Sequence, residues 1–116
     1  MYEFKKGTDV IQMDDGKIIL HISINVPKVE NTFLIDIPSL NIHTYTSNKD
    51  EISEKVDHSL FSFFKYWLLI EGKEKLIEHM LKLGFTIQDI SNKDSNKPKN
   101  SRGKNRTIFN RELLIQ

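Results

Sequence analysis

The stretch from residue 33 to residue 63 constrains the fold more than any other part of the chain. It opens with an apolar segment, residues 33–37, that ends at Pro38. Proline lacks a backbone donor and is kept out of central strands, so we place the end of a strand there. A helix then opens near Ser47 or Asn48, because each has an acidic residue three positions on, the spacing of a capping box. A strand, a polar connection and a helix in this order indicate an α+β domain.

Alternating apolar and polar residues predict further antiparallel strands. The clearest covers residues 18–26, with one apolar and one mostly polar face, and a shorter strand covers residues 10–13. Asp14-Asp15-Gly16 between them is a hairpin-turn signal. We also expect a strand at 32–37, an edge or loop segment at 42–46, and a closing edge strand at 86–90. These segments predict a sheet of three to four antiparallel strands.

The helix after residue 48 has a wide apolar face. Its main stripe advances by three or four residues from position 52 to position 70, as in an amphipathic helix. A second stripe lies beside it, and two interpretations stay open. The aromatic cluster either packs entirely in the core or leaves part of its width for a subunit or partner interface. For that interface the candidate residues are Phe61, Phe64, Trp67 and Leu68.

A glycine divides the helical region. Gly72 predicts a break, and a second short helix follows at residues 74–83, with Gly84 as its C-terminal cap. The expected architecture is therefore β-β-β-α, with one long amphipathic helix packed on the sheet and a second short helix after it.

Charge separates the chain into two parts. Residues 91–116 hold seven basic and two acidic residues, a net charge of +5, whereas residues 1–90 have a net charge of −4. We therefore assign residues 1–90 to an α+β domain and residues 91–116 to a basic low-complexity tail. The tail is either solvated disorder or an arm that binds nucleic acid or an acidic partner. Apolar residues at 108–109 and 113–115 allow its end to dock as a short strand or helix. Its candidate contacts are Lys97, Lys99, Arg102, Lys104 and Arg106.

The residues offer little catalytic chemistry. The chain has no cysteine, and its four histidines are scattered without metal-ligand spacing. Asp36 and the Asp14-Asp15 turn leave only a remote hypothesis, a metal-dependent hydrolase. We expect no enzyme activity, no metal and no cofactor. The most apolar run, residues 60–70, is shorter than the ~20 residues that span a bilayer. The lack of cysteine fits a reducing compartment, so we expect a cytoplasmic protein without a membrane span.

Residues 10–70 resemble the HicB-type antitoxin domain. The resemblance rests on the strand and proline at residues 33–40, on Thr44 and Thr46 after them, and on Asp50-Glu51 at the helix start. It implies an α+β fold, homo-oligomers, and masking of a small basic RNA-cleaving toxin of the HicA type. The acidic body suits a basic partner. Nothing after Gly84 resembles the DNA-binding modules that many members carry. A nucleic-acid-binding protein with a basic arm and an orphan oligomeric domain remain the alternatives.

Overall fold

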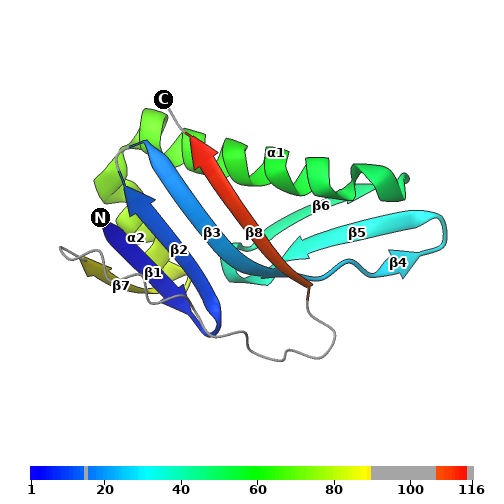
Figure 1. Ribbon diagram of the computed structural model, residues 1–116, viewed down its shortest axis with the longest axis horizontal. Helices are drawn as coiled ribbons and strands as arrows, with labels where there is room; N and C mark the ends of the chain where they lie inside the picture. The colour runs from blue at the N-terminus through cyan, green and yellow to red at the C-terminus, as the bar shows by residue number, and fades with distance from the viewer. Residues whose placement is uncertain (15, 90–106, 115–116) are drawn as a thin grey trace.

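The computed structural model describes residues 1–14, 16–89 and 107–114 and has an α+β fold, as the sequence predicts. Both α-helices lie on one side of the largest sheet (Figure 1). The strands are β1 (Tyr2–Lys6), β2 (Asp9–Asp14), β3 (Lys17–Ile24), β4 (Lys28–Val29), β5 (Thr32–Ile37), β6 (Ile42–Thr46), β7 (Thr86–Asp89) and β8 (Thr107–Leu114). The helices are α1 (Ile52–Lys65) and α2 (Lys73–Lys82), with 3-10 turns η1 (Pro38–Leu40) and η2 (Lys49–Glu51) and the π-helical η3 (Tyr66–Glu71).

The described strands form two antiparallel sheets instead of the single sheet of three to four strands that was predicted. One sheet has the order β7-β1-β2-β3-β8 and the other has the order β4-β5-β6. They meet just after β3, where Asn25 and Asp36 exchange two backbone hydrogen bonds of 2.8 Å. The strands expected near residues 10–13, 18–26, 32–37, 42–46 and 86–90 are all present. The strand number is larger because β1 and β4 were not predicted and the form of β8 was left open.

Strand β8 corrects the assignment of residues 91–116 to a separate tail. It pairs along the whole of β3, from Lys17 opposite Leu114 to Ile24 opposite Thr107. Residues 107–114 are therefore part of the folded domain, and of the docking modes expected for this segment the strand is the one observed. The proposed boundary at residue 91 lies outside the described residues.

The connection between β5 and α1 is built as its sequence suggests. Pro38 ends β5 and starts η1, and Asn41 after it adopts the left-handed conformation that asparagine tolerates, with φ of 55°. Of the two candidate caps, Asn48 is the one used, since its side chain accepts a hydrogen bond from the Asp50 amide at 3.0 Å. In a capping box the Glu51 side chain would accept a hydrogen bond from the Asn48 amide. Here it accepts one from the hydroxyl of Thr46 instead, at 3.0 Å.

The helices bury one stripe each against the sheets. In α1 the buried residues are Val56, Leu60 and Phe64. Val56 and Leu60 belong to the predicted main stripe, whereas Phe64 was assigned to the second stripe. The predicted break is confirmed at Gly72, whose φ of 103° is a conformation that side chains disfavour. Helix α2 follows and buries Leu76 and Met80.

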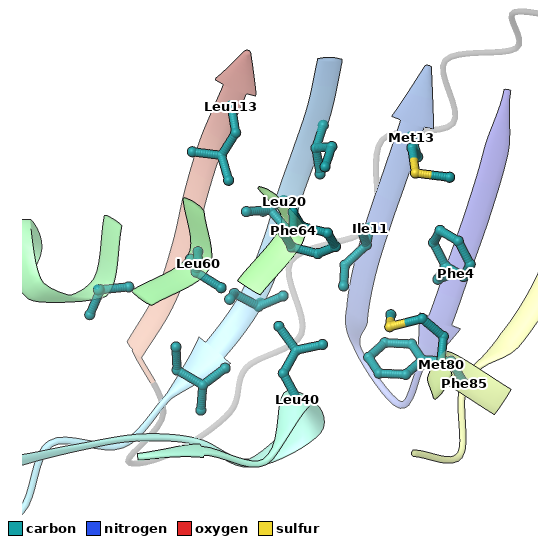
Figure 2. Packing of buried hydrophobic residues seen from close by; sticks show 14 of the residues in the cluster. Phe4, Ile11, Met13, Leu20, Leu40, Leu60, Phe64, Met80, Phe85 and Leu113 are labelled. Atoms are coloured by element: carbon teal, nitrogen blue, oxygen red, sulfur yellow. The ribbon is translucent and has the colours of Figure 1, made fainter. Parts of the chain in front are cut away.

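The hydrophobic core lies between the helices and the larger sheet. Figure 2 shows Leu60 and Phe64 of α1 over the face formed by Leu20 of β3 and Leu113 of β8. At the other end of the core, Met80, Phe85 and Phe4 lie together. The described part of the chain contains no helix that is both long and apolar enough to span a membrane.

Candidate interaction surfaces

The four residues predicted to form a subunit interface do not share one surface. Phe64 is fully buried in the core, so its assignment to an interface is wrong. Trp67 is half-buried and stacks on the ring of His79, with the ring centroids 4.4 Å apart. Leu68 is also half-buried and packs against the core. Phe61 is about a third exposed, at 36%. Only part of the wide apolar face of the helix therefore reaches solvent.

The exposed part of that face lies farther along, in η3. A π-helical turn holds more residues than an α-helical turn, and such turns recur at functional sites. Here it exposes Tyr66, Leu69 and Ile70, with Ile70 at 72%, and we call these three residues the π-helix surface. The Tyr66 hydroxyl donates a 2.8 Å hydrogen bond to Glu71, which raises the pKa of Tyr66 above its ordinary value. The assignment of Ile70 to the main apolar stripe is therefore wrong, because the helical period changes at η3, and Leu69 was assigned to neither stripe.

A second apolar surface lies on the small sheet. Val29, Leu34 and Tyr45, one from each strand, are 53%, 40% and 66% exposed. Leu34 and Tyr45 stand directly opposite each other in the β5–β6 register. Because side chains alternate along a strand, Ile35 and Ile37 point to the opposite face and are buried there. Figure 1 shows α1 running along β5 and β6. We call Val29, Leu34 and Tyr45 the outer sheet face.

The outer sheet face was not predicted, although the sequence holds a signal for it. The pattern of residues 32–37 assigns positions 33, 35 and 37 to the core, which leaves an apolar leucine at position 34 facing outward. Tyr45 between two threonines is the matching signal on the next strand. An apolar residue on the solvent side of a half-buried strand is a weak signal alone, because single exposed apolar residues are common.

One polar pair accompanies these apolar residues. Nδ1 of His43 lies 2.7 Å from Oδ1 of Asp36. These two residues pair two register positions along from Leu34 and Tyr45, on the same face of the sheet. The other ring nitrogen of His43 is 3.1 Å from Oδ1 of Asn41. Within residues 1–14, 16–89 and 107–114, no three His, Cys, Asp or Glu side chains gather as metal ligands would. Asp15 of the hydrolase hypothesis lies outside these ranges.

The remaining histidines serve structural contacts or face solvent. His21 on the polar face of β3 contacts the side chain of Asn110 in β8, and His58 is exposed. His79 lies against the rings of Phe63 and Trp67. Burial lowers the pKa of His79 below its ordinary value, and the nearby charge of Lys82 acts in the same direction.

The candidate nucleic-acid contacts Lys97, Lys99, Arg102, Lys104 and Arg106 all lie outside the described residues. One basic residue of the same segment is placed, and it serves the fold. Arg111 of β8 donates to Asp57 and to the hydroxyl of Ser53, both at 2.7 Å, and so ties β8 to α1.

A polar pocket of about 250 Å³ lies at the end of the larger sheet, where the β1–β2 turn, the end of β3 and η1 meet. It contains three buried polar side chains, Asp9, Ser23 and Ser39. Comparisons with protein-family models, with curated proteins and with solved structures gave no match for this chain.

Proposed function

We propose that this chain is a non-catalytic interaction protein of the antitoxin kind, which acts in the cytoplasm by binding and masking a small basic RNA-cleaving protein of the HicA type. The observation that carries the proposal is the outer sheet face. Three apolar side chains from three strands stand exposed together there, on the side of the sheet opposite the buried residues under α1. Exposed apolar groups gathered on one face are a common mark of protein-binding surfaces.

The order of elements in residues 32–65 supports the antitoxin interpretation. A strand ends at Pro38, a second strand carries Thr44 and Thr46, and an acidic turn opens the helix. The resemblance to the HicB-type domain implies the same order but with the threonines in a loop, and here they lie in β6, paired with β5.

Charge supports a basic partner. Residues 1–90 have a net charge of −4, and Asp36 lies on β5 beside the outer sheet face, with Glu30 in the adjoining β4–β5 turn. Complementary charge speeds the encounter of two proteins and selects against wrong partners more than it adds affinity.

Masking requires area and shape, with no covalent step. A stable complex buries roughly 800 Å² on each partner, which is about a tenth of the 7946 Å² surface of this chain. The three apolar side chains of the outer sheet face would form the dry centre of such an interface, with Asp36 and His43 at its rim. A partner held there cannot present the covered surface to RNA.

Self-association is assigned in this proposal to the π-helix surface. Tyr66, Leu69 and Ile70 lie at the far end of α1 from the outer sheet face, so a second copy bound there leaves that face open. In a two-fold dimer the same patch meets itself. Light scattering should then give a dimer for the wild type and a monomer for Ile70→Asp; a wild-type monomer would remove this assignment.

The alternative function is nucleic-acid binding through the basic segment, favoured by its net charge of +5. It predicts an affinity that falls steeply with salt, because binding releases counterions from the phosphates. It also predicts that the outer sheet face has no influence on binding.

The proposal is tested by isolating the tagged protein at its native expression level, with nuclease and high salt in the washes. We expect a small basic protein in stoichiometric amount that cleaves RNA once separated. Leu34→Asp should weaken its binding by about thirtyfold, the effect of losing one central contact. Leu81→Asp is the matched control, since Leu81 is equally apolar, 56% exposed and on α2.

Three outcomes would overturn the antitoxin proposal. They are recovery of nucleic acid alone, a partner without RNA-cleaving activity, and equal binding by the Leu34→Asp and Leu81→Asp variants. The first outcome, with release by salt, would favour the alternative function.

A further inference from the structure

The polar pocket holds a negatively charged group that lacks a counter-ion. Asp9 is buried, and its Oδ1 accepts hydrogen bonds from the amide and the hydroxyl of Ser23, at 3.0 and 2.9 Å. Among the described residues no basic side chain forms an ion pair with it. A buried carboxylate is costly unless a positive group or a full set of donors compensates it. Two donors from one serine leave its second oxygen without a described partner.

Lys6 also lines the pocket, but its ammonium group is engaged elsewhere. The ammonium of Lys6 donates to the carbonyl of Leu83 at 2.6 Å, at the carboxyl end of α2. The same nitrogen lies 5.8 Å from the centre of the Phe85 ring. Both contacts hold the ammonium of Lys6 at the carboxyl end of α2, and it forms no ion pair with Asp9.

A second observation concerns Ser39. Its hydroxyl lines the pocket, is buried, and has no hydrogen-bond partner among the described residues. Buried hydroxyl groups almost always find a partner, because leaving one unpaired costs free energy. The hydroxyl of Ser39 is therefore available to accept from, or donate to, a group that enters the pocket.

Asn25 adds a third polar group. Its backbone is used in the bridge to Asp36, and its side-chain amide forms no hydrogen bond with a described residue. The turn Gly7-Thr8 also lines the pocket, and of these two residues only Gly7 has a positive φ, at 61°. Glycine at the first position of a two-residue hairpin turn fixes the turn without a side chain that would fill the space.

From these groups we infer that the pocket binds one protonated amine or guanidinium group. The carboxylate of Asp9 supplies the charge, and the oxygens of Ser39 and Asn25 supply acceptors for the remaining N–H donors. An anion would meet the buried carboxylate, and one carboxylate is too few for a divalent metal. The volume of about 250 Å³ is several times the ~30 Å³ share of one water molecule, so it has room for such a group with part of its alkyl chain.

On the proposed function, which this step assumes, the group is a lysine or arginine side chain of the basic partner. The same chemistry is offered by a free small amine. The pocket would bind the group in the same way from either source. Binding to the pocket and the source of the group can therefore be tested separately.

The pocket is tested first without a partner, by NMR titration of the full ¹⁵N-labelled chain with methylguanidinium and with butylammonium chloride. We expect saturable shifts of the amides of Asp9, Ser23 and Ser39. Tetramethylammonium is the control for charge alone, because it has no N–H donor. No saturation with either probe, or equal shifts with tetramethylammonium, would overturn the inference.

Asp9→Asn is the diagnostic variant, since asparagine keeps the oxygen that accepts from Ser23 and loses only the charge. It should weaken probe binding at least about tenfold, the usual scale for losing one member of a buried charge pair. If it fails to fold, Ser39→Ala takes its place and should weaken binding several-fold. Glu78→Gln, which removes an exposed charge on α2, should have no effect. Equal binding by all variants would overturn the inference.

Whether the bound group belongs to the partner or to a free amine is tested by measuring the affinity of each variant for the isolated partner. A loss of partner affinity in Asp9→Asn, and none in Glu78→Gln, assigns the group to the partner. An unchanged affinity overturns that assignment and leaves the pocket to a free amine. Failure of the proposed function and failure of the pocket are thus separate results, because the probe titration uses no partner.

Discussion

Alanine substitutions at Phe64 and Phe61 test which of the two side chains of α1 lies in the core and which lies at the surface. The two residues are three positions apart and chemically identical, but Phe64 is fully buried and Phe61 is about one third exposed. The ring of Phe64 also meets that of Phe63 edge to face, with centroids 5.0 Å apart. Phe64→Ala therefore leaves a cavity in the core between α1 and the larger sheet.

The expected magnitudes differ clearly. Deleting a fully buried phenylalanine side chain costs about 3–5 kcal/mol, which is a large part of the ~5–15 kcal/mol stability of a domain. For a domain of 116 residues this corresponds to a fall in melting temperature of roughly 10–20 °C. Phe61→Ala removes a side chain that already contacts water, so its cost should be about 1 kcal/mol.

Urea denaturation followed by circular dichroism measures both free energies of unfolding, and a thermal scan gives the melting temperatures. The m-value should stay constant, so that the difference reports stability alone. Equal losses for the two variants would refute the placement of Phe64 in the core. A larger loss of unfolding free energy for Phe61→Ala would show that α1 turns its other face toward the sheet.

Three further predictions test other parts of the fold. Acidification below pH 6.5 should destabilise the protein through His79, since its folded-state pKa lies below 6.5 and the unfolded chain is protonated first. His79→Gln should flatten the pH dependence of the unfolding free energy between pH 6.5 and the folded-state pKa, and an unchanged slope would contradict this. Asn48→Ala should cost about 1 kcal/mol in urea denaturation and Ser47→Ala nothing measurable, because only Asn48 caps η2, the turn that leads into α1. Leu113→Ala should cost about 2–4 kcal/mol and Leu114→Ala under about 0.5, and equal costs would contradict the register of β8.

The elements that the sequence predicts well are those whose pattern is local. The alternation in residues 18–26 predicts which face of β3 is buried, and the spacing of Val56 and Leu60 predicts the first part of the buried stripe of α1. Gly72 and Asn48 mark ends that depend only on backbone conformation and capping. Each of these signals is contained in a few neighbouring residues.

The elements that it misses depend on distant partners. Strand β1 has charged residues at three of its five positions, and it is placed by pairing with β2 and β7. In β8 the charged Arg111 takes a position toward α1, because Asp57 is there to neutralise it. No local pattern shows this.

The candidate surfaces are harder to predict than the core. The π-helix surface departs from the α-helical period, so spacing wrongly places Ile70 in the main apolar stripe and does not place Leu69. The polar pocket assembles Asp9, Ser23 and Ser39 from three separate segments, and each alone resembles an ordinary turn or strand residue.

Masking through the outer sheet face is tested most directly by a titration of RNA cleavage by the isolated partner with this protein. We expect cleavage to fall linearly to zero at a fixed molar ratio. Leu34→Asp should fail to inhibit at that ratio, whereas Leu81→Asp should inhibit as the wild type does. Cleavage that continues at saturating wild-type protein, or inhibition by Leu34→Asp equal to that of the wild type, would contradict it.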